Sequence, residues 1–282
     1  MVEKKISIYG EADVQTPLNS DILVVEVGNT YAVLLVKSIG KNTVNAFEYF
    51  EFNKAIADWY EIFYQLRMHS KILDRSYNDT RVFYNLPNTV VMPFAQYKPE
   101  SAEVYLNAIH GNIEKSIVRT DEVFSTIELS IIYSIGKSLY DMVNSNLMMI
   151  SSKHSYSKII EEVLRSNKSA GGVFMKVQFY NQLMVIVVMN SGKLQFIQTY
   201  SYQIVDDVLY YILNVVQQFQ LPIENMMVEV AGLVNANSSE LNYLQKIFPK
   251  ISFDTNITDH SFKDISKEYP LHYFSPFINL LL

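Results

Sequence analysis

The order strand, turn, strand, strand, helix occurs twice in this sequence, and this repeat restricts the possible folds more than any other feature. The first copy is expected over Ile22–Val27, Tyr31–Lys37, Val44–Phe52 and a helix at Lys54–Met68. The second is expected over Gly172–Phe179, Gln182–Met189, Leu194–Tyr200 and a helix that starts near Asp206. Because there are only two copies, the repeat predicts two duplicated lobes and not a solenoid.

Turn residues show how these strands connect. Gly28-Asn29-Thr30 separates the first two strands of the first copy, and Asn190-Ser191-Gly192-Lys193 separates the last two strands of the second. Gly and Asn tolerate the positive φ that tight hairpins require. The pattern therefore predicts an α/β protein whose two lobes each open with an antiparallel meander and continue into a helix.

The stretch 166–172 is the most linker-like part of the chain, and we place the lobe boundary there. The first lobe is expected over residues 1–168 and the second over residues 169–282. Strand alternation places Val185 and Val187 in the interior of the second lobe, and helical spacing adds Leu213.

Composition excludes several classes of protein. Hydrophobic residues make up 49% and charged residues 18%, which predicts a packed core and not a disordered chain. The net charge of −6 argues against a nucleic-acid partner held through phosphates. The absence of cysteine excludes disulfides, thiolate zinc sites and cysteine nucleophiles. The five histidines have no metal-ligand spacing, so no metal site is expected.

The N-terminal segment has no apolar stretch of the kind found in secretory signals. The longest apolar run, Leu183–Met189, is far shorter than the ~20 residues of a membrane helix. We therefore expect a cytoplasmic protein without an integral membrane segment.

The two tandem lobes resemble the actin-like ATPase fold, a duplication of ribonuclease-H-like lobes found in sugar kinases, heat-shock chaperone ATPases and actins. The layout is most similar to that of the pilus-assembly and cell-division actin homologues. More narrowly, the segment Gly172–Leu221 and the tail His272-Tyr273-Phe274 resemble an uncharacterised bacterial family with that fold. The resemblance extends over nearly the whole chain and is weakest in the middle.

The resemblance implies a nucleotide cleft built from three motifs. In that superfamily the first hairpin carries Asp-x-Gly-Thr-Thr, whose amides wrap the phosphates and whose Asp holds water around Mg²⁺. The matching residues here are Glu26, Gly28, Asn29 and Thr30. Glu in place of Asp lengthens the side chain enough to disturb an octahedral Mg²⁺ shell. The alternative is that Gly28-Asn29 is simply a hairpin turn.

The other two motifs depart further from the family pattern. The second phosphate loop, Asp-x-Gly-x-Gly-Thr, matches Lys176, Gln178, Phe179, Tyr180 and Asn181, with neither an acid nor a glycine left. Lys176 is either a point charge for a phosphate or an ordinary strand lysine. The adenosine motif keeps one glycine, Gly232, within Val228–Val234.

Two hypotheses of function follow from the resemblance. The first is a catalytically degenerate actin-like protein that binds an unknown protein partner and needs no cofactor. It has no catalytic residue, and its vestigial nucleotide cleft is formed by Glu26, Gly28, Asn29, Thr30 and Gly232. The second is a nucleotide-binding switch or slow ATPase that uses Mg-ATP. A small-molecule kinase is disfavoured because no catalytic acid follows a phosphate loop. The sequence leaves the enzyme question and the oligomeric state open, with the first hypothesis favoured.

Overall fold

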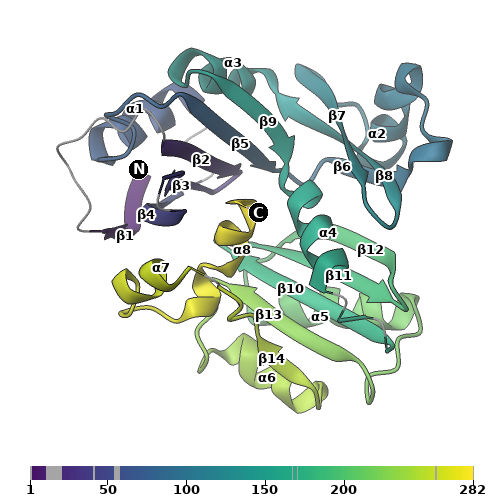
Figure 1. Cartoon of the computed structure of the whole chain (residues 1–282). Helices are drawn as coiled ribbons and strands as arrows, with labels where there is room; N and C mark the ends of the chain where they lie inside the picture. The colour runs from purple at the N-terminus through teal and green to yellow at the C-terminus, as the bar shows by residue number, and fades with distance from the viewer. Residues whose placement is uncertain are drawn as a thin grey trace.

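The computed structural model describes residues 2–10, 21–40, 42–53, 58–166, 168–169, 171–257 and 259–281. Two large sheets lie in different halves of the molecule (Figure 1). The first has the strand order β1-β4-β3-β2-β5-β9, with bounds Val2–Tyr9, Thr43–Phe52, Tyr31–Ser38, Asp21–Gly28, Asp79–Asn85 and Ile150–His154. The second has the order β12-β11-β10-β13-β14, with bounds Lys193–Ser201, Leu183–Asn190, Val173–Tyr180, Met227–Gly232 and Ile251–Phe253.

The same topology occurs in both sheets. In each, three consecutive strands form an antiparallel meander, β2-β3-β4 and β10-β11-β12, as the sequence predicted. The first strand of each meander then pairs in parallel with a later strand, β2 with β5 and β10 with β13. Ser191 and Gly192 have φ values of 49° and 77°, which close the two-residue turn between β11 and β12.

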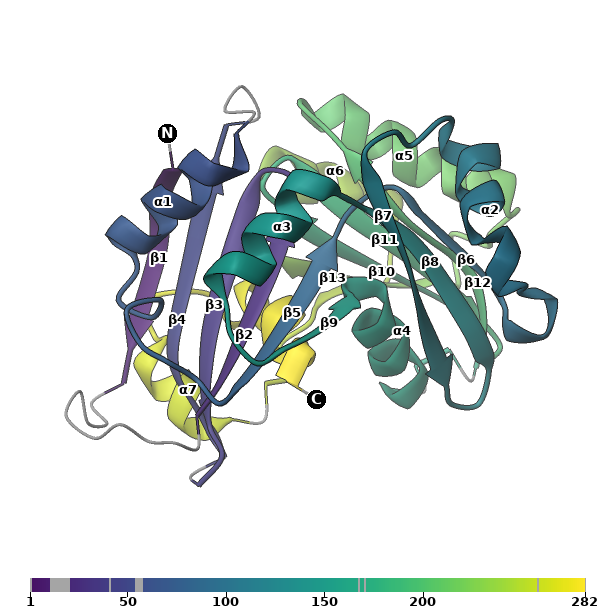
Figure 2. The ribbon, with the colours of Figure 1, turned by 90° about the horizontal axis from the view of Figure 1, so that it is seen from above.

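The helices and sheets form layers, which Figures 1 and 2 show from two directions. Helices α1 (Trp59–His69) and α3 (Lys137–Asn146) cover the outer face of the first sheet. Helices α5 (Val205–Gln218) and α6 (Ser239–Ile247) cover the outer face of the second. Helix α4 (Ser155–Ser166) and the C-terminal segment lie between the two sheets.

The C-terminal segment contains α7 (His260–Ile265), α8 (Ser275–Ile278) and two short 3₁₀ turns, Leu271–Tyr273 and Asn279–Leu281. Helix α7 contacts β4, and the Asp259 carboxylate accepts a hydrogen bond from the Val44 N–H. The last residues are buried, with Leu280 only 1% exposed. The C-terminal segment therefore joins the second half of the chain to the first sheet.

A small third sheet, β6-β8-β7, is inserted between β5 and α3. Its strands β6, β8 and β7 span Thr89–Pro93, Glu128–Gly136 and Ser116–Phe124. Between β6 and β7 lie α2 (Ala102–His110) and two short 3₁₀ turns, Phe94–Gln96 and Pro99–Ser101. Strands β7 and β8 form an antiparallel hairpin within this sheet. None of the described helices is long and apolar enough to cross a membrane.

The hydrophobic core has two parts, one of which the two large sheets share. Val185 and Val187 are fully buried in the shared part, together with residues of β2, β3 and the C-terminal segment. The alternate residues of β11, such as Ile186, face α5 in the other part. Leu213 was predicted to be buried but is 38% exposed, because Val208, Ile212, Val215 and Val216 form the inward face of α5.

Strand β1 was not predicted, although it pairs with β4 along the edge of the first sheet. Helix α5 begins at Val205, close to the predicted start at Asp206, and Asp206 and Asp207 both lie in its first turn. The Asp207 carboxylate accepts hydrogen bonds from the Gln203 and Ile204 N–H groups.

Candidate functional site

The turns of the two equivalent hairpins meet between the lobes. Thr30, in the β2–β3 turn, donates its hydroxyl to the backbone carbonyl of Asn181, in the β10–β11 turn, at 2.6 Å. The Asn181 side-chain amide donates back to the Thr30 carbonyl at 3.3 Å, and the Asn181 N–H donates to the Tyr49 hydroxyl at 3.2 Å. The two turns that would hold phosphates, by the resemblance above, are therefore bonded directly to each other.

Aromatic rings fill the space behind these turns. The ring of Tyr31 stacks on Tyr180 with centroids 5.0 Å apart and on Tyr49 with centroids 5.8 Å apart. Phe277, from the C-terminal α8, packs edge-on against Tyr180 at 5.7 Å. All three tyrosines are at most 2% exposed. The stack therefore joins both meanders and the C-terminal segment into one packed unit.

The two candidate glycines are surrounded by protein atoms. A Cβ atom at Gly28 would lie 2.3 Å from Cε1 of the Tyr31 ring. A Cβ atom at Gly232 would lie 2.1 Å from the Phe179 carbonyl oxygen, and Gly232 also has a φ of 83° that L side chains rarely adopt. Both positions require glycine, but the close approach is to this chain's own residues.

Glu26 lies at the base of this region in β2 and is only 1% exposed. Its carboxylate accepts hydrogen bonds from the Ser155 hydroxyl at 2.6 Å and the Tyr31 hydroxyl at 3.1 Å. Burial raises its pKa to about 7, although both hydroxyl donors oppose the shift. Asn85 donates to the Tyr31 hydroxyl at 2.7 Å and extends the network into β5. Glu26 therefore gains or loses its charge near neutral pH.

The opening beside the two turns is small and acidic. A pocket of about 290 Å³ is lined by Glu3, Glu51, Phe52, Asn53, Asn181 and Gln182. Glu3 and Glu51 pair across β1 and β4, and Glu51 pairs with Tyr31 across β4 and β3. Burial raises the pKa of Glu51, while Lys5 opposes that shift. Lys5 pairs with both carboxylates, at 2.7 Å from Glu3 and 4.0 Å from Glu51, and the net negative charge of the three groups disfavours an anionic ligand.

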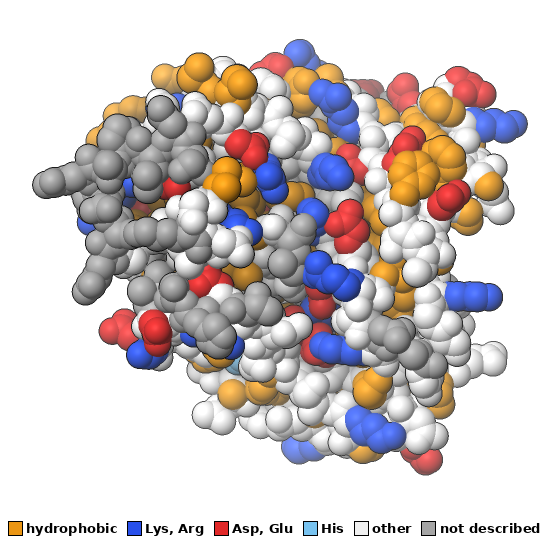
Figure 3. Space-filling model, viewed as in Figure 1, with side chains coloured by type: hydrophobic (Ala, Val, Ile, Leu, Met, Phe, Trp, Pro, Cys, Tyr) orange, Lys and Arg blue, Asp and Glu red, His pale blue; other side chains and the backbone are white. Residues whose placement is uncertain are grey.

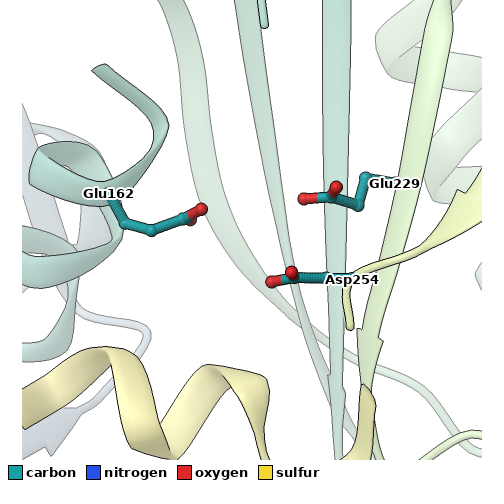
Figure 4. A group of neighbouring side chains, drawn as sticks. All are labelled: Glu162, Glu229 and Asp254. Atoms are coloured by element: carbon teal, nitrogen blue, oxygen red, sulfur yellow. The ribbon is translucent and has the colours of Figure 1, made fainter. Parts of the chain in front are cut away.

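A second buried cluster lies around Lys176 in β10, on the side of the second sheet that faces α4. Figure 4 shows Glu162, Glu229 and Asp254 pointing toward one another from α4, β13 and the residue after β14. The Lys176 ammonium lies 2.7 Å from both Glu162 and Asp254 and 3.3 Å from Glu229. Lys168 also pairs with Glu229.

One oxygen from each of these three carboxylates lies within 4.8 Å of the others, a spacing that suits a cation. The Lys176 ammonium takes that place, so the cluster holds its own cation. Burial disfavours the charged lysine, but the surrounding carboxylates raise its pKa overall. Lys176 is thus neither a phosphate ligand nor an ordinary strand lysine, because its side chain is fully buried among acids.

The sequence-predicted residues come together only in part. Glu26, Gly28 and Thr30 lie along one hairpin, and Asn29 is half-buried within the same turn. Gly232 lies in the second sheet, where it packs against Phe179 of the neighbouring strand β10. Sequence reasoning missed the tyrosine stack and the Lys176 cluster. The sequence features that pointed to them were tyrosines at both turns and a lysine inside a mainly apolar strand.

The sequence matches the model of a family described as "Protein of unknown function (DUF3822)" over residues 13–251, and the chain belongs to that family. No curated protein shows significant similarity to it.

Solved structures share the fold at low sequence identity. A Bacteroides thetaiotaomicron protein described as having an actin-like ATPase fold and unknown function superposes with a TM-score of 0.76. It is 16% identical, and the match covers 87% of this chain and 95% of that one. A chain of a PilM–PilN type IV pilus biogenesis complex has a TM-score of 0.57 at 10% identity, over 94% and 97% of the two chains. The chain therefore has an actin-like ATPase fold, as the resemblance implied.

Proposed function

We propose that this chain is a non-catalytic protein of actin-like fold that acts as a binding or assembly module in the cytoplasm and needs no nucleotide. The main support for this proposal is that the two turns are hydrogen-bonded directly to each other through Thr30 and Asn181. A triphosphate would have to break these bonds and displace the stacked rings of Tyr31 and Tyr180. It would also pass the carboxylates of Glu3 and Glu51.

On this proposal, Glu26, Gly28, Asn29, Thr30 and Gly232 are the remains of a nucleotide cleft, and Thr30 now bonds one lobe to the other. The lobe boundary near residues 168 and 169 is part of the same proposal. A neighbour of the same fold is found in a type IV pilus biogenesis complex, which supports a role through a protein partner. Fold likeness alone does not identify that partner.

The test is a thermal-unfolding and calorimetric titration of the full chain with Mg-ATP and Mg-ADP. Binding would stabilise the folded state by ~2.7 kcal/mol at a hundredfold excess over Kd, which raises Tm by several degrees. We expect no resolvable shift at millimolar Mg-ATP and no phosphate release above a protein-free blank.

A rise in Tm that saturates with nucleotide concentration would instead favour the nucleotide-binding switch. The variant Glu26→Gln then identifies the site, because it keeps the shape of the side chain but removes the acid that stands in for the family aspartate. Glu26→Gln is a better test than a larger residue at Gly28. A side chain at Gly28 would clash with the Tyr31 ring even in the absence of nucleotide, so its effect would not be specific to nucleotide binding.

A further inference from the structure

The outer face of α1 exposes an apolar stripe. Tyr60, Tyr64 and Met68 are 64%, 54% and 65% exposed, and their spacing of four residues places them on one side of the helix. The opposite side of α1 buries Ile62, Phe63 and Leu66 in the core. The stripe is therefore extra apolar surface, beyond what attaches the helix to its sheet.

A pocket of about 380 Å³ lies at the C-terminal end of this stripe. Arg67 from α1 and Met148 from the loop after α3 both line it, with Leu73 and Arg75 from the loop after α1. Met148 and its neighbour Met149 are 72% and 70% exposed. Figure 3 shows hydrophobic side chains gathered along the upper left edge, over α1 and α3. Methionines adapt well to the shape of a partner.

The charge around this pocket is opposite in sign to that of the whole chain. The chain carries a net charge of −6, but Arg67 and Arg75 both line this pocket, with Asp74 as the single acid among its lining residues. Neither arginine forms an ion pair among the described residues. Within the same part of the chain, the Arg67 guanidinium donates to the side-chain and backbone carbonyl oxygens of Asn146.

We propose that this α1 surface, formed by Tyr60, Tyr64, Arg67, Met68, Arg75 and Met148, docks an acidic amphipathic helix of a partner protein. Apolar residues of that helix, at i, i+3, i+4 and i+7, lie along the stripe. Its carboxylates lie over the pocket, where they pair with Arg67 and Arg75. This inference rests on the proposed function as a binding module and locates its binding surface.

The probe is a labelled synthetic peptide of Leu, Ala and Glu with leucines on one helical face, and its matched counterpart carries Lys in place of Glu. We expect the Glu peptide to bind the full chain, more weakly as salt is raised, and the Lys peptide not to bind. Tyr64→Glu and Arg67→Glu should each weaken binding about tenfold or more. Tyr210→Glu and Lys246→Glu, at exposed positions on α5 and α6, are the controls and should change nothing.

Several results would overturn this proposal: no binding of the Glu peptide at millimolar concentration, equal binding of the Lys peptide, or equal loss in the α5 and α6 variants. Binding to vesicles of anionic phospholipid in place of the peptide would make the surface a membrane contact. A change of oligomeric state in Tyr64→Glu, measured by light scattering, would make it a contact between copies of the chain. Nucleotide binding is measured separately, so failure of the proposed function and failure of this surface are distinguishable.

Discussion

The first strands of the two equivalent meanders bury charge in opposite ways. In the first lobe, the Glu26 carboxylate on β2 accepts hydrogen bonds from two hydroxyl groups, and no cation pairs with it among the described residues. In the second lobe, Lys176 on β10 is held by Glu162, Asp254 and Glu229. The first group can give up its charge by binding a proton, while the second is surrounded by charges that keep it ionised.

The difference predicts that the two buried groups respond differently to pH. Burial raises the pKa of Glu26 to about 7, so its uncompensated charge is removed by protonation near neutrality. In the Lys176 cluster, burial opposes the charge of Asp254, but the ammonium lowers the pKa of Asp254 overall. Burial raises the pKa of Glu162 in the same cluster although Lys176 opposes that shift, so its acids do not respond to pH alike. The contribution of the cluster to stability depends on keeping the ammonium among the three acids.

The largest effect is expected for Lys176→Met. The change removes the cation and leaves Glu162, Glu229 and Asp254 buried together. Loss of one partner from a buried ion pair costs about 3–5 kcal/mol, a large share of the ~5–15 kcal/mol stability of a domain. The free energy of unfolding from a denaturant titration measures this cost.

Lys168→Met is the matched control, because Lys168 pairs with the same Glu229 but its side chain is 32% exposed. It should lose far less stability than Lys176→Met. Equal losses, or a Lys176→Met protein as stable as the wild type, would contradict the central role given to the buried ammonium. Added divalent cation that restores only Lys176→Met would show that the three acids accept a metal once the lysine is gone.

A smaller effect, with a distinct pH profile, is expected for Glu26→Gln. In the unfolded chain this carboxyl is solvated and has the ordinary glutamate pKa of 4.5, whereas in the folded chain its pKa is about 7. Between these values the folded state keeps a proton that the unfolded state has lost. The stability from Glu26 is therefore fully present below pH 4.5, declines as pH rises, and is lost above about 7. The decline amounts to about 3 kcal/mol.

Glu26→Gln removes this titration and should gain stability relative to the wild type as pH rises from 5 to 8. Unfolding titrations of both proteins across that range give the difference directly, and titrations common to both proteins cancel. A difference that stays constant with pH would show that Glu26 is ionised throughout, and the contrast between the two lobes would then fail.

The sequence predicted the parts of this site that depend on local chemistry. Gly28-Asn29 and Ser191-Gly192 correctly indicated where two of the turns lie, and the meanders follow from strand patterns. Only the second of these turns uses positive φ, at Ser191 and Gly192; in the β10–β11 turn Gln182 has a φ of 55°. Strand β1 was missed because consecutive charges, Glu3, Lys4 and Lys5, obscure the alternation of an edge strand. The charge of an edge strand protects it from pairing with other chains and weakens its pattern.

What the sequence did not predict depends on residues far apart along the chain. Lys176 meets Glu162 across 14 positions and Asp254 across 78. Gly28 and Gly232 were predicted as parts of a nucleotide cleft, and the atoms nearest to a Cβ at either position belong to Tyr31 and Phe179. A periodicity argument predicts burial, correctly for Val185 and Val187 and wrongly for Leu213, but it does not identify the partners of a buried residue.

The smallest effect is expected for Thr30→Val, which keeps the shape of the side chain and removes the hydroxyl that donates to the Asn181 carbonyl. A single hydrogen bond contributes about 0.5–1.5 kcal/mol, so the variant should unfold at a slightly lower denaturant concentration. Thr43→Val is the control, since its hydroxyl donates to the Asn45 side chain within β4 and not across the lobes. The informative measurement is amide hydrogen exchange at Asn181, whose N–H donates to Tyr49. If the two turns close the cleft together, Thr30→Val should speed exchange there, and Thr43→Val should not. Unchanged exchange in Thr30→Val would show that the aromatic stack alone keeps the lobes together.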